Sequence, residues 1–126
     1  MEKELIQSTL LAVCNWVKDY NKSNAATPRE LYLKTKYGEY HDMITEGDIE
    51  KILQDNIGLI DLWETFSMDK RWSPSWYFTR LESGKSEVGY YHHYEKLKKH
   101  MLFDDEVKAC AFFIKMEMED FRKRNG

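Results

Sequence analysis

The sequence lacks the features that mark several large classes of protein. It has only two cysteines, Cys14 and Cys110, too few for a scaffold that depends on many disulfide bonds. Each lies on the apolar side of a helical pattern, which favours buried free thiols in a reducing compartment. A single disulfide between the first and last helices also fits the sequence.

Long apolar runs are missing as well. No segment approaches the roughly 20 apolar residues that a membrane-spanning helix needs. The segment 1–13 has acidic residues before its apolar part and no small-residue cleavage site, so it does not resemble a signal peptide. We therefore expect a cytoplasmic protein that does not interact with a membrane.

No familiar catalytic motif is present, and no serine or cysteine has a sequence context that would expose and activate it. The segment richest in chemical groups is 87–103, EVGYYHHYEKLKKHMLF, with three tyrosines and three histidines. Alternation along a strand places His92 and His93 on opposite faces, and His100 can join only one of them. Two ligands fall short of the three or four that zinc needs. We expect a non-enzymatic protein without a metal or cofactor.

The apolar and aromatic content is sufficient for one core, at 42% and 14% of the residues. We predict a single α+β domain over 1–126, with a helical part at 1–58 and a sheet with its closing helix at 59–126. Its architecture is three N-terminal helices, a four-stranded antiparallel meander and a C-terminal helix packed on the sheet.

Periodicity and capping signals define the helical part. Apolar residues at steps of three and four predict a first helix over about 6–20. Thr27 begins a capping box with Glu30, and that helix should stop near Gly38. Thr45 begins the third helix, which carries Asp48 in its first turn and Gly58 as its left-handed C-terminal residue.

After Gly58 the pattern changes to that of a meander, with strands over 59–66, 75–82, 86–93 and 96–103. Gly84 should be left-handed in the first hairpin. The predicted cross-strand pairs are Trp76 with Tyr90, Phe78 with Val88, Val88 with Met101 and Tyr90 with Lys99, with Tyr94-Glu95 as the second connection. Phe78, Val88, Met101 and Phe103 should form the apolar face.

The closing helix should cover that face. Asp104 is its predicted N-cap. Its apolar stripe consists of Val107, Cys110, Ala111, Ile114, Met118 and Phe121.

Nucleic-acid binding has two possible anchors. Three helices followed by a hairpin resemble a winged helix-turn-helix, but the third helix, TEGDIEKILQDN, is acidic and would be repelled by phosphates. We therefore expect no binding to duplex nucleic acid. Single-stranded bases could instead stack on the hairpin. The residues for this alternative are Tyr90, Tyr91 and Tyr94 with Lys96, Lys98 and Lys99.

One part of the sequence resembles a known group of proteins. Residues 75–119 contain Trp76-Tyr77, Val88-Gly89-Tyr90-Tyr91, Phe103-Asp104 and a helix with Ala109-Cys110 and Phe112-Phe113. This run is similar to the C-terminal half of small immunity proteins of bacterial polymorphic and contact-dependent toxin systems. The resemblance implies a protein that binds and neutralises a cognate toxin domain by protein–protein contact. A regulatory or phage-encoded interaction protein would present the same features.

The net charge is −3, and the acidic excess is concentrated between Glu39 and Asp55. Toxin domains that cut nucleic acids are usually basic, and an acidic surface would associate with them rapidly. The alternative is an ordinary solvated surface. The predicted partner-binding residues lie between the second and third helices: Tyr37, Glu39, Tyr40, Asp42, Glu46 and Asp48.

The open face of the sheet is the competing surface, with Tyr77, Tyr91 and His93. Alternation along the strands would leave these side chains on the side away from the closing helix. With either surface, we expect a monomer or a small homo-oligomer.

Overall fold

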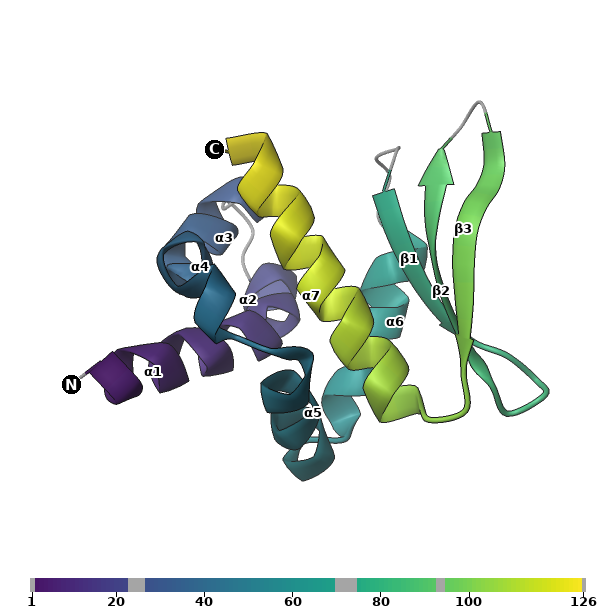
Figure 1. Ribbon diagram of the computed structural model, residues 1–126, viewed down its shortest axis with the longest axis horizontal. Helices are drawn as coiled ribbons and strands as arrows, with labels where there is room; N and C mark the ends of the chain where they lie inside the picture. The colour runs from purple at the N-terminus through teal and green to yellow at the C-terminus, as the bar shows by residue number, and fades with distance from the viewer. Residues whose placement is uncertain (1, 23–26, 70–74, 93–94, 126) are drawn as a thin grey trace.

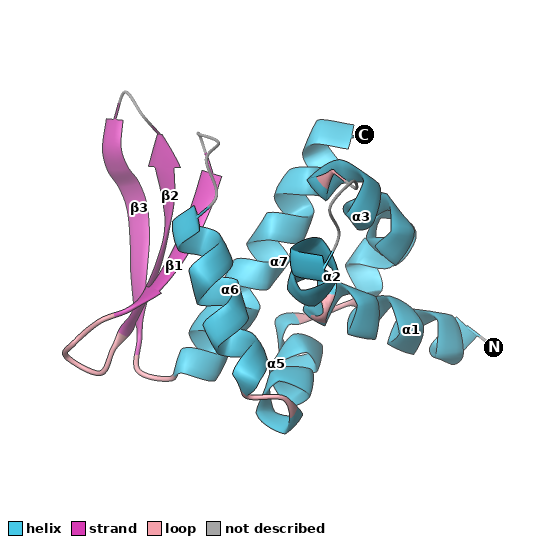
Figure 2. Cartoon of the chain, turned by 180° about the vertical axis from the view of Figure 1, so that it is seen from behind, coloured by secondary structure: helices cyan, strands magenta, loops and turns pink. Residues whose placement is uncertain are grey.

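The computed structural model describes residues 2–22, 27–69, 75–92 and 95–125. Its elements in chain order are α1 (Glu2–Cys14), α2 (Trp16–Lys22), α3 (Pro28–Thr35), α4 (Tyr37–Tyr40), the 3-10 helix η1 (His41–Met43), α5 (Glu46–Asp55), α6 (Gly58–Asp69), β1 (Ser75–Arg80), β2 (Ser86–His92), β3 (Glu95–Phe103) and α7 (Glu106–Asn125). Helices α1 to α5 lie on one side and the sheet on the other, with α6 and α7 between them (Figures 1 and 2). The predicted α+β class is confirmed, but the described residues contain more helices and one strand fewer than predicted.

The first helical region is divided at Asn15. One helix was expected over about 6–20, whereas the structure has α1 and α2 with a turn between them. Asn15 Nδ2 donates a hydrogen bond to the carbonyl of Leu11 at 2.9 Å. An asparagine side chain that binds its own backbone competes with regular helix geometry. The apolar stripe is nevertheless buried, as at Leu10 and Val17.

Both predicted capping residues begin helices. The Thr27 hydroxyl accepts a hydrogen bond from the backbone N–H of Glu30 at 3.1 Å. At the start of α5, Thr45 and Asp48 exchange two hydrogen bonds between side chain and backbone, each 3.1 Å long. Each cap satisfies donors that the first helical turn leaves unpaired, and it stabilises the helix by about 1 kcal/mol.

The ends of these helices differ from the prediction. α3 ends at Thr35, and its C-cap, Lys36, has a left-handed φ of 64°, while Gly38 lies inside α4. α5 ends before Asn56, and Gly58 begins α6 instead of ending the preceding helix. A glycine marks a helix end only when the chain needs a left-handed residue there, and in this segment Lys36 takes that conformation.

The strand predicted over 59–66 is wrong, because this segment is the helix α6. Leu59, Ile60 and Trp63 are buried, at the spacing of one helix face. A short run of apolar and aromatic residues fits a buried strand and a buried helix equally well. Tertiary contact favours the helix: Trp63 Nε1 donates to the carbonyl of Cys14 at 3.0 Å and joins α6 to α1.

The sheet is an antiparallel meander of three strands in the order β1-β2-β3. The predicted pairs are all present: Trp76 with Tyr90, Phe78 with Val88, Val88 with Met101 and Tyr90 with Lys99. Gly84 has a φ of 91°, which confirms the left-handed turn of the first hairpin.

The second hairpin departs from the predicted register near its end. His92 pairs with Glu95, and the ladder is irregular between Tyr90 and His92. The connection is therefore 93–94, which lies outside the described residues, and not 94–95.

α7 covers the inner face of the sheet, as predicted. Phe113 stacks on Phe78, with ring centroids 5.9 Å apart. The predicted stripe is buried throughout: Val107, Cys110, Ala111, Ile114, Met118 and Phe121. The N-cap is Asp105 instead of Asp104, because the Asp105 carboxylate accepts from the N–H of Val107 at 2.8 Å.

The two edges of the sheet have different surroundings. Along β1, side chains of α6 accept the outward N–H groups: Ser67 Oγ bonds Phe78 N at 2.7 Å, and Glu64 bonds Arg80 N at 2.6 Å. β3 forms the other edge, and the prediction that Met101 is part of the buried face is wrong, since it is 43% exposed. Side chains of α6 thus protect the β1 edge, whereas part of β3 is exposed.

Candidate partner-binding surface

Exposed acidic side chains occur where α4, η1 and the first turn of α5 follow one another. Glu39, Asp42 and Glu46 are exposed, Met43 is 45% exposed, and Tyr40 is half-buried. We call these five residues the acidic corner. It combines carboxylates with apolar surface within one short stretch of chain.

Two residues of the predicted surface have internal contacts. The prediction that Tyr37 is an exposed aromatic anchor is wrong: its side chain is fully buried, and its hydroxyl donates to Glu119 Oε2 at 2.5 Å. Asp48 is half-buried, and its carboxylate accepts the N–H of Thr45 in the capping box. Chain order brings all six predicted residues together, but Tyr37 lies beneath the surface formed by the others.

Lys115 of α7 supports the acidic corner from below. Its ammonium group donates to the carbonyl of His41 at 2.8 Å and to that of Ile44 at 2.6 Å. It also lies 4.9 Å from the centroid of the Tyr37 ring. Burial lowers the pKa of Lys115, while the nearby carboxylates of Glu119 and Glu46 oppose that change. One lysine therefore fixes both ends of η1.

Glu119, one helical turn after Lys115, completes this support. Arg122 Nη2 donates to Glu119 Oε1 at 2.8 Å, and Tyr37 donates to Oε2. Burial alone would raise the pKa of Glu119, but the hydrogen bonds from Arg122 and Tyr37 outweigh it and hold the pKa at about 2. Neither Lys115 nor Glu119 was predicted from the sequence. The available signal was weak: two charges one turn apart on an otherwise apolar helix.

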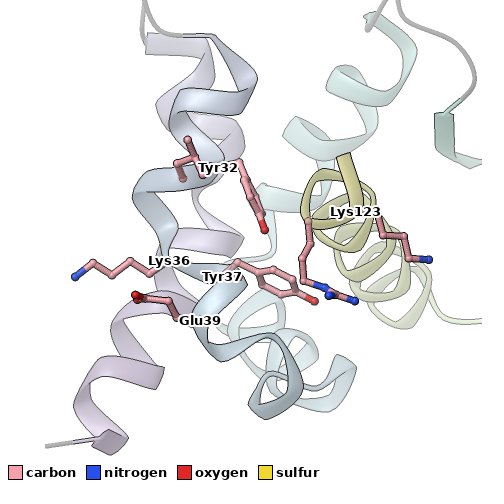
Figure 3. A pocket seen from close by; sticks show the side chains of 8 residues that line it. Tyr32, Lys36, Tyr37, Glu39 and Lys123 are labelled. Carbon is pink, nitrogen blue, oxygen red and sulfur yellow. The ribbon is translucent and has the colours of Figure 1, made fainter. Parts of the chain in front are cut away.

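A cavity of about 670 Å³ opens beside the acidic corner, between α3–α4 and the end of α7. Its apolar walls include Tyr32, Leu33 and Tyr37, and its charged residues are Lys36, Glu39, Arg122 and Lys123. Figure 3 shows the hydroxyl groups of Tyr32 and Tyr37 directed into the space between the helices, whereas Lys36 and Lys123 extend outward on opposite sides. Three cations and one carboxylate thus surround a partly aromatic space.

A second group of charges joins α6, β1 and α7 around Arg80. Its guanidinium group donates to Glu64 at 2.7 Å, to Asp61 at 2.5 Å and to Glu106 at 3.2 Å. Burial would raise the pKa of Glu64, but the hydrogen bonds from Arg80 outweigh it and lower that pKa. We call Arg80 and these three carboxylates the Arg80 cluster. It links three elements that are distant in sequence.

The competing face of the sheet is described only in part. The Tyr77 hydroxyl donates to Glu87 Oε2 at 2.5 Å, and Tyr77 is half-buried. The backbone of Tyr91 pairs with Ser75, while the side chain of Tyr91 and all of His93 lie outside the described part of the chain. The strands β1 and β2 lie on the other side of α7 from α4 (Figure 1).

The two thiols are free and buried, so the open question of a disulfide is settled in favour of free cysteines. Burial raises the pKa of Cys14 to about 12 and also raises that of Cys110. Both thiols are therefore protonated at neutral pH. Among the described residues, no three side chains of His, Cys, Asp or Glu are grouped as metal ligands. No helix in the described ranges has the length and apolarity required to span a bilayer.

Comparisons of the chain with protein-family models, curated proteins and solved structures find no match. The resemblance of residues 75–119 to immunity proteins therefore stays a prediction.

Proposed function

We propose that this protein is a non-enzymatic inhibitor of the immunity type, which binds a basic bacterial toxin domain through the acidic corner. The observation that carries the proposal is the fixed presentation of Glu39, Asp42 and Glu46 above the contacts of Lys115. The toxin class comes from the resemblance in residues 75–119, and the contact surface comes from the charges.

The support beneath the corner favours binding because it lowers the entropy lost on association. Residues 41–44 form only a short 3-10 helix and its exit, a conformation that would otherwise be mobile. Lys115 holds the carbonyls at both ends of this segment, and the Thr45 capping box holds the start of α5. A surface already held in its binding conformation gains affinity in this way.

Charge and apolar area have separate roles in this proposal. The three exposed carboxylates accelerate encounter with a basic partner, and salt weakens that effect. Met43 and Tyr40 provide the area that a partner can cover. When such side chains fill pockets on a partner, they account for most of the slow dissociation of the complex.

The test is binding of this protein to a toxin domain encoded by an adjacent gene, measured by surface plasmon resonance at two salt concentrations; an adjacent gene without such a domain would count against the proposal. We expect the double variant Glu39→Lys/Asp42→Lys to slow association about tenfold or more at low salt, with a smaller effect at high salt. The matched control is Asp19→Lys/Glu82→Lys, which reverses two exposed carboxylates outside the acidic corner.

Three outcomes would contradict the proposal. Equal slowing by both double variants would show a general charge effect. Loss of binding in Tyr91→Ala alone would place the interface on the sheet. Salt-dependent binding of single-stranded nucleic acid, weakened by Lys98→Ala, would support the stacking alternative.

A further inference from the structure

The hydroxyl group of Tyr32 faces the cavity between α3–α4 and the end of α7. Tyr32 is 3% exposed, and its ring stacks on Phe121 with centroids 5.3 Å apart, so its position is fixed. Among the described residues, no protein group bonds the Tyr32 hydroxyl, which is open to the cavity. Figure 3 shows this hydroxyl directed into the cavity. A hydroxyl group that opens into a cavity can form hydrogen bonds with water or with a ligand there.

Gly38 keeps that hydroxyl accessible. A Cβ atom at this position would lie 3.4 Å from the Tyr32 oxygen. Gly38 is inside α4 without a left-handed φ, so its backbone does not require glycine. An alanine methyl group would come into contact with the Tyr32 hydroxyl and take up part of the space beside it.

Arg122 adds directed donors to the same cavity. Its hydrogen bonds to Glu119 use Nε and Nη2. Within the described part of the chain, Nη1 has no partner, and Arg122 lines the cavity. A guanidinium held in place on one side and open on the other is well suited to bind a carboxylate or phosphate oxygen.

We propose that this cavity binds a small organic anion, in which a carboxylate or phosphate group is attached to a flat or apolar body. Tyr32 and Arg122 bond the anionic group, and the exposed side chain of Leu33 contacts the body. A volume of about 670 Å³ accommodates a molecule of that size. Lys36 and Lys123, at the rim, attract an anion from solution.

This inference is independent of the proposed function, because it requires no protein partner. The probes are phenyl phosphate and phenylacetate, with benzyl alcohol as the neutral control, titrated by isothermal calorimetry and by NMR. We expect saturable binding of at least one anion, about tenfold tighter than that of benzyl alcohol. The tighter of the two anions identifies the group that the cavity prefers.

Two variants locate the binding. Tyr32→Phe removes only the hydroxyl, and Gly38→Ala fills the space beside it; each should weaken binding of the better anion about tenfold. The matched controls are Tyr20→Phe, whose ring stacks on Trp16, and Gly47→Ala in α5. Both controls should bind like the parent, and circular dichroism checks the fold of all four.

The inference is overturned if neither anion binds saturably up to about 10 mM, a range that includes weak complexes. Binding of benzyl alcohol as tightly as the anions would also overturn it. So would anion binding that neither Tyr32→Phe nor Gly38→Ala changes, since the anion would then occupy another site.

Discussion

The Arg80 cluster and the acidic corner are both rich in carboxylates, but their charges have different surroundings. In the Arg80 cluster, one guanidinium group bonds Glu64, Asp61 and Glu106 and joins three elements. In the acidic corner, the nearby cation Lys115 bonds two backbone carbonyls instead of the exposed carboxylates. Acidic charge therefore stabilises the fold at the first place and remains available to a partner at the second.

Both regions depend on α7, so the largest effect is expected from its core. Ile114 is fully buried, and Ile114→Ala should lower the free energy of unfolding by about 2–5 kcal/mol. Thermal melting measures this change. The control is Met68→Ala, where the side chain is 71% exposed and the loss should be below about 0.5 kcal/mol. Equal melting temperatures for the two variants would refute the role of α7 as the cover of the sheet.

The second effect concerns the Arg80 cluster alone. Arg80→Met removes all three ion pairs and leaves Glu64 half-buried without its cation. We expect a loss of about 2 kcal/mol in urea unfolding, less than for a fully buried pair because Arg80 and two of its partners reach solvent. Lys85→Met is the control: its pair with Asp104 is 3.7 Å long and exposed, and its loss should be near zero.

Because the Arg80 cluster and the acidic corner are separate regions, we expect Arg80→Met to leave partner binding unchanged. An unfolding free energy that does not change would show that the cluster is only a surface ion pair. A changed association rate with the toxin domain would show that the two regions are not separate.

A third experiment targets the support of the acidic corner. Lys115→Met keeps the apolar stem but removes the hydrogen bonds to the His41 and Ile44 carbonyls. We expect a loss of about 1–2 kcal/mol in stability and faster amide hydrogen exchange in residues 41–46. Lys108→Met, at an exposed position of α7, is the control. Unchanged exchange at the corner would mean that the capping box alone orders it.

Local signals predicted the fold well wherever a residue acts within its own segment. The caps at Thr27 and Thr45 and the turn at Gly84 depend on nearby backbone, and the structure contains all three. The register of β1 with β2 followed from alternation and from the turn length, whereas the connection between β2 and β3 was predicted one residue too late. These features could be derived because the chemistry that determines them lies within a few residues.

Features that depend on distant partners could not be derived. α6 resembled a strand because nothing in residues 59–66 reveals that Trp63 will donate to the carbonyl of Cys14. Tyr37 looked like a surface aromatic because its partner, Glu119, is 82 positions away. The exposed carboxylates of the acidic corner were predicted from the sequence. The residues of α7 that support the backbone beneath them, Lys115 and Glu119, were not.

The smallest expected effect concerns the hydrogen bond from Tyr37 of α4 to Glu119 of α7, and it depends on pH. Glu119 has a pKa of about 2, below its ordinary value of 4.5, so its ionised form is favoured by folding. The stability that it contributes is complete above about pH 4.5 and is lost as the pH falls towards 2. Tyr37→Phe removes one hydrogen bond to the carboxylate and should raise the pKa of Glu119, with a loss of about 1 kcal/mol at neutral pH.

NMR titration of the Glu119 carboxyl and urea unfolding at several pH values measure these two quantities. Because Arg122 still bonds Glu119 in the variant, the pKa should stay below 4.5. Tyr20→Phe, whose ring stacks on Trp16 and which does not bond Glu119, should change neither the pKa nor its effect on stability. If Tyr37→Phe leaves the Glu119 pKa unaltered, Arg122 alone determines it, and the Tyr37 hydroxyl does not connect the base of the acidic corner to α7.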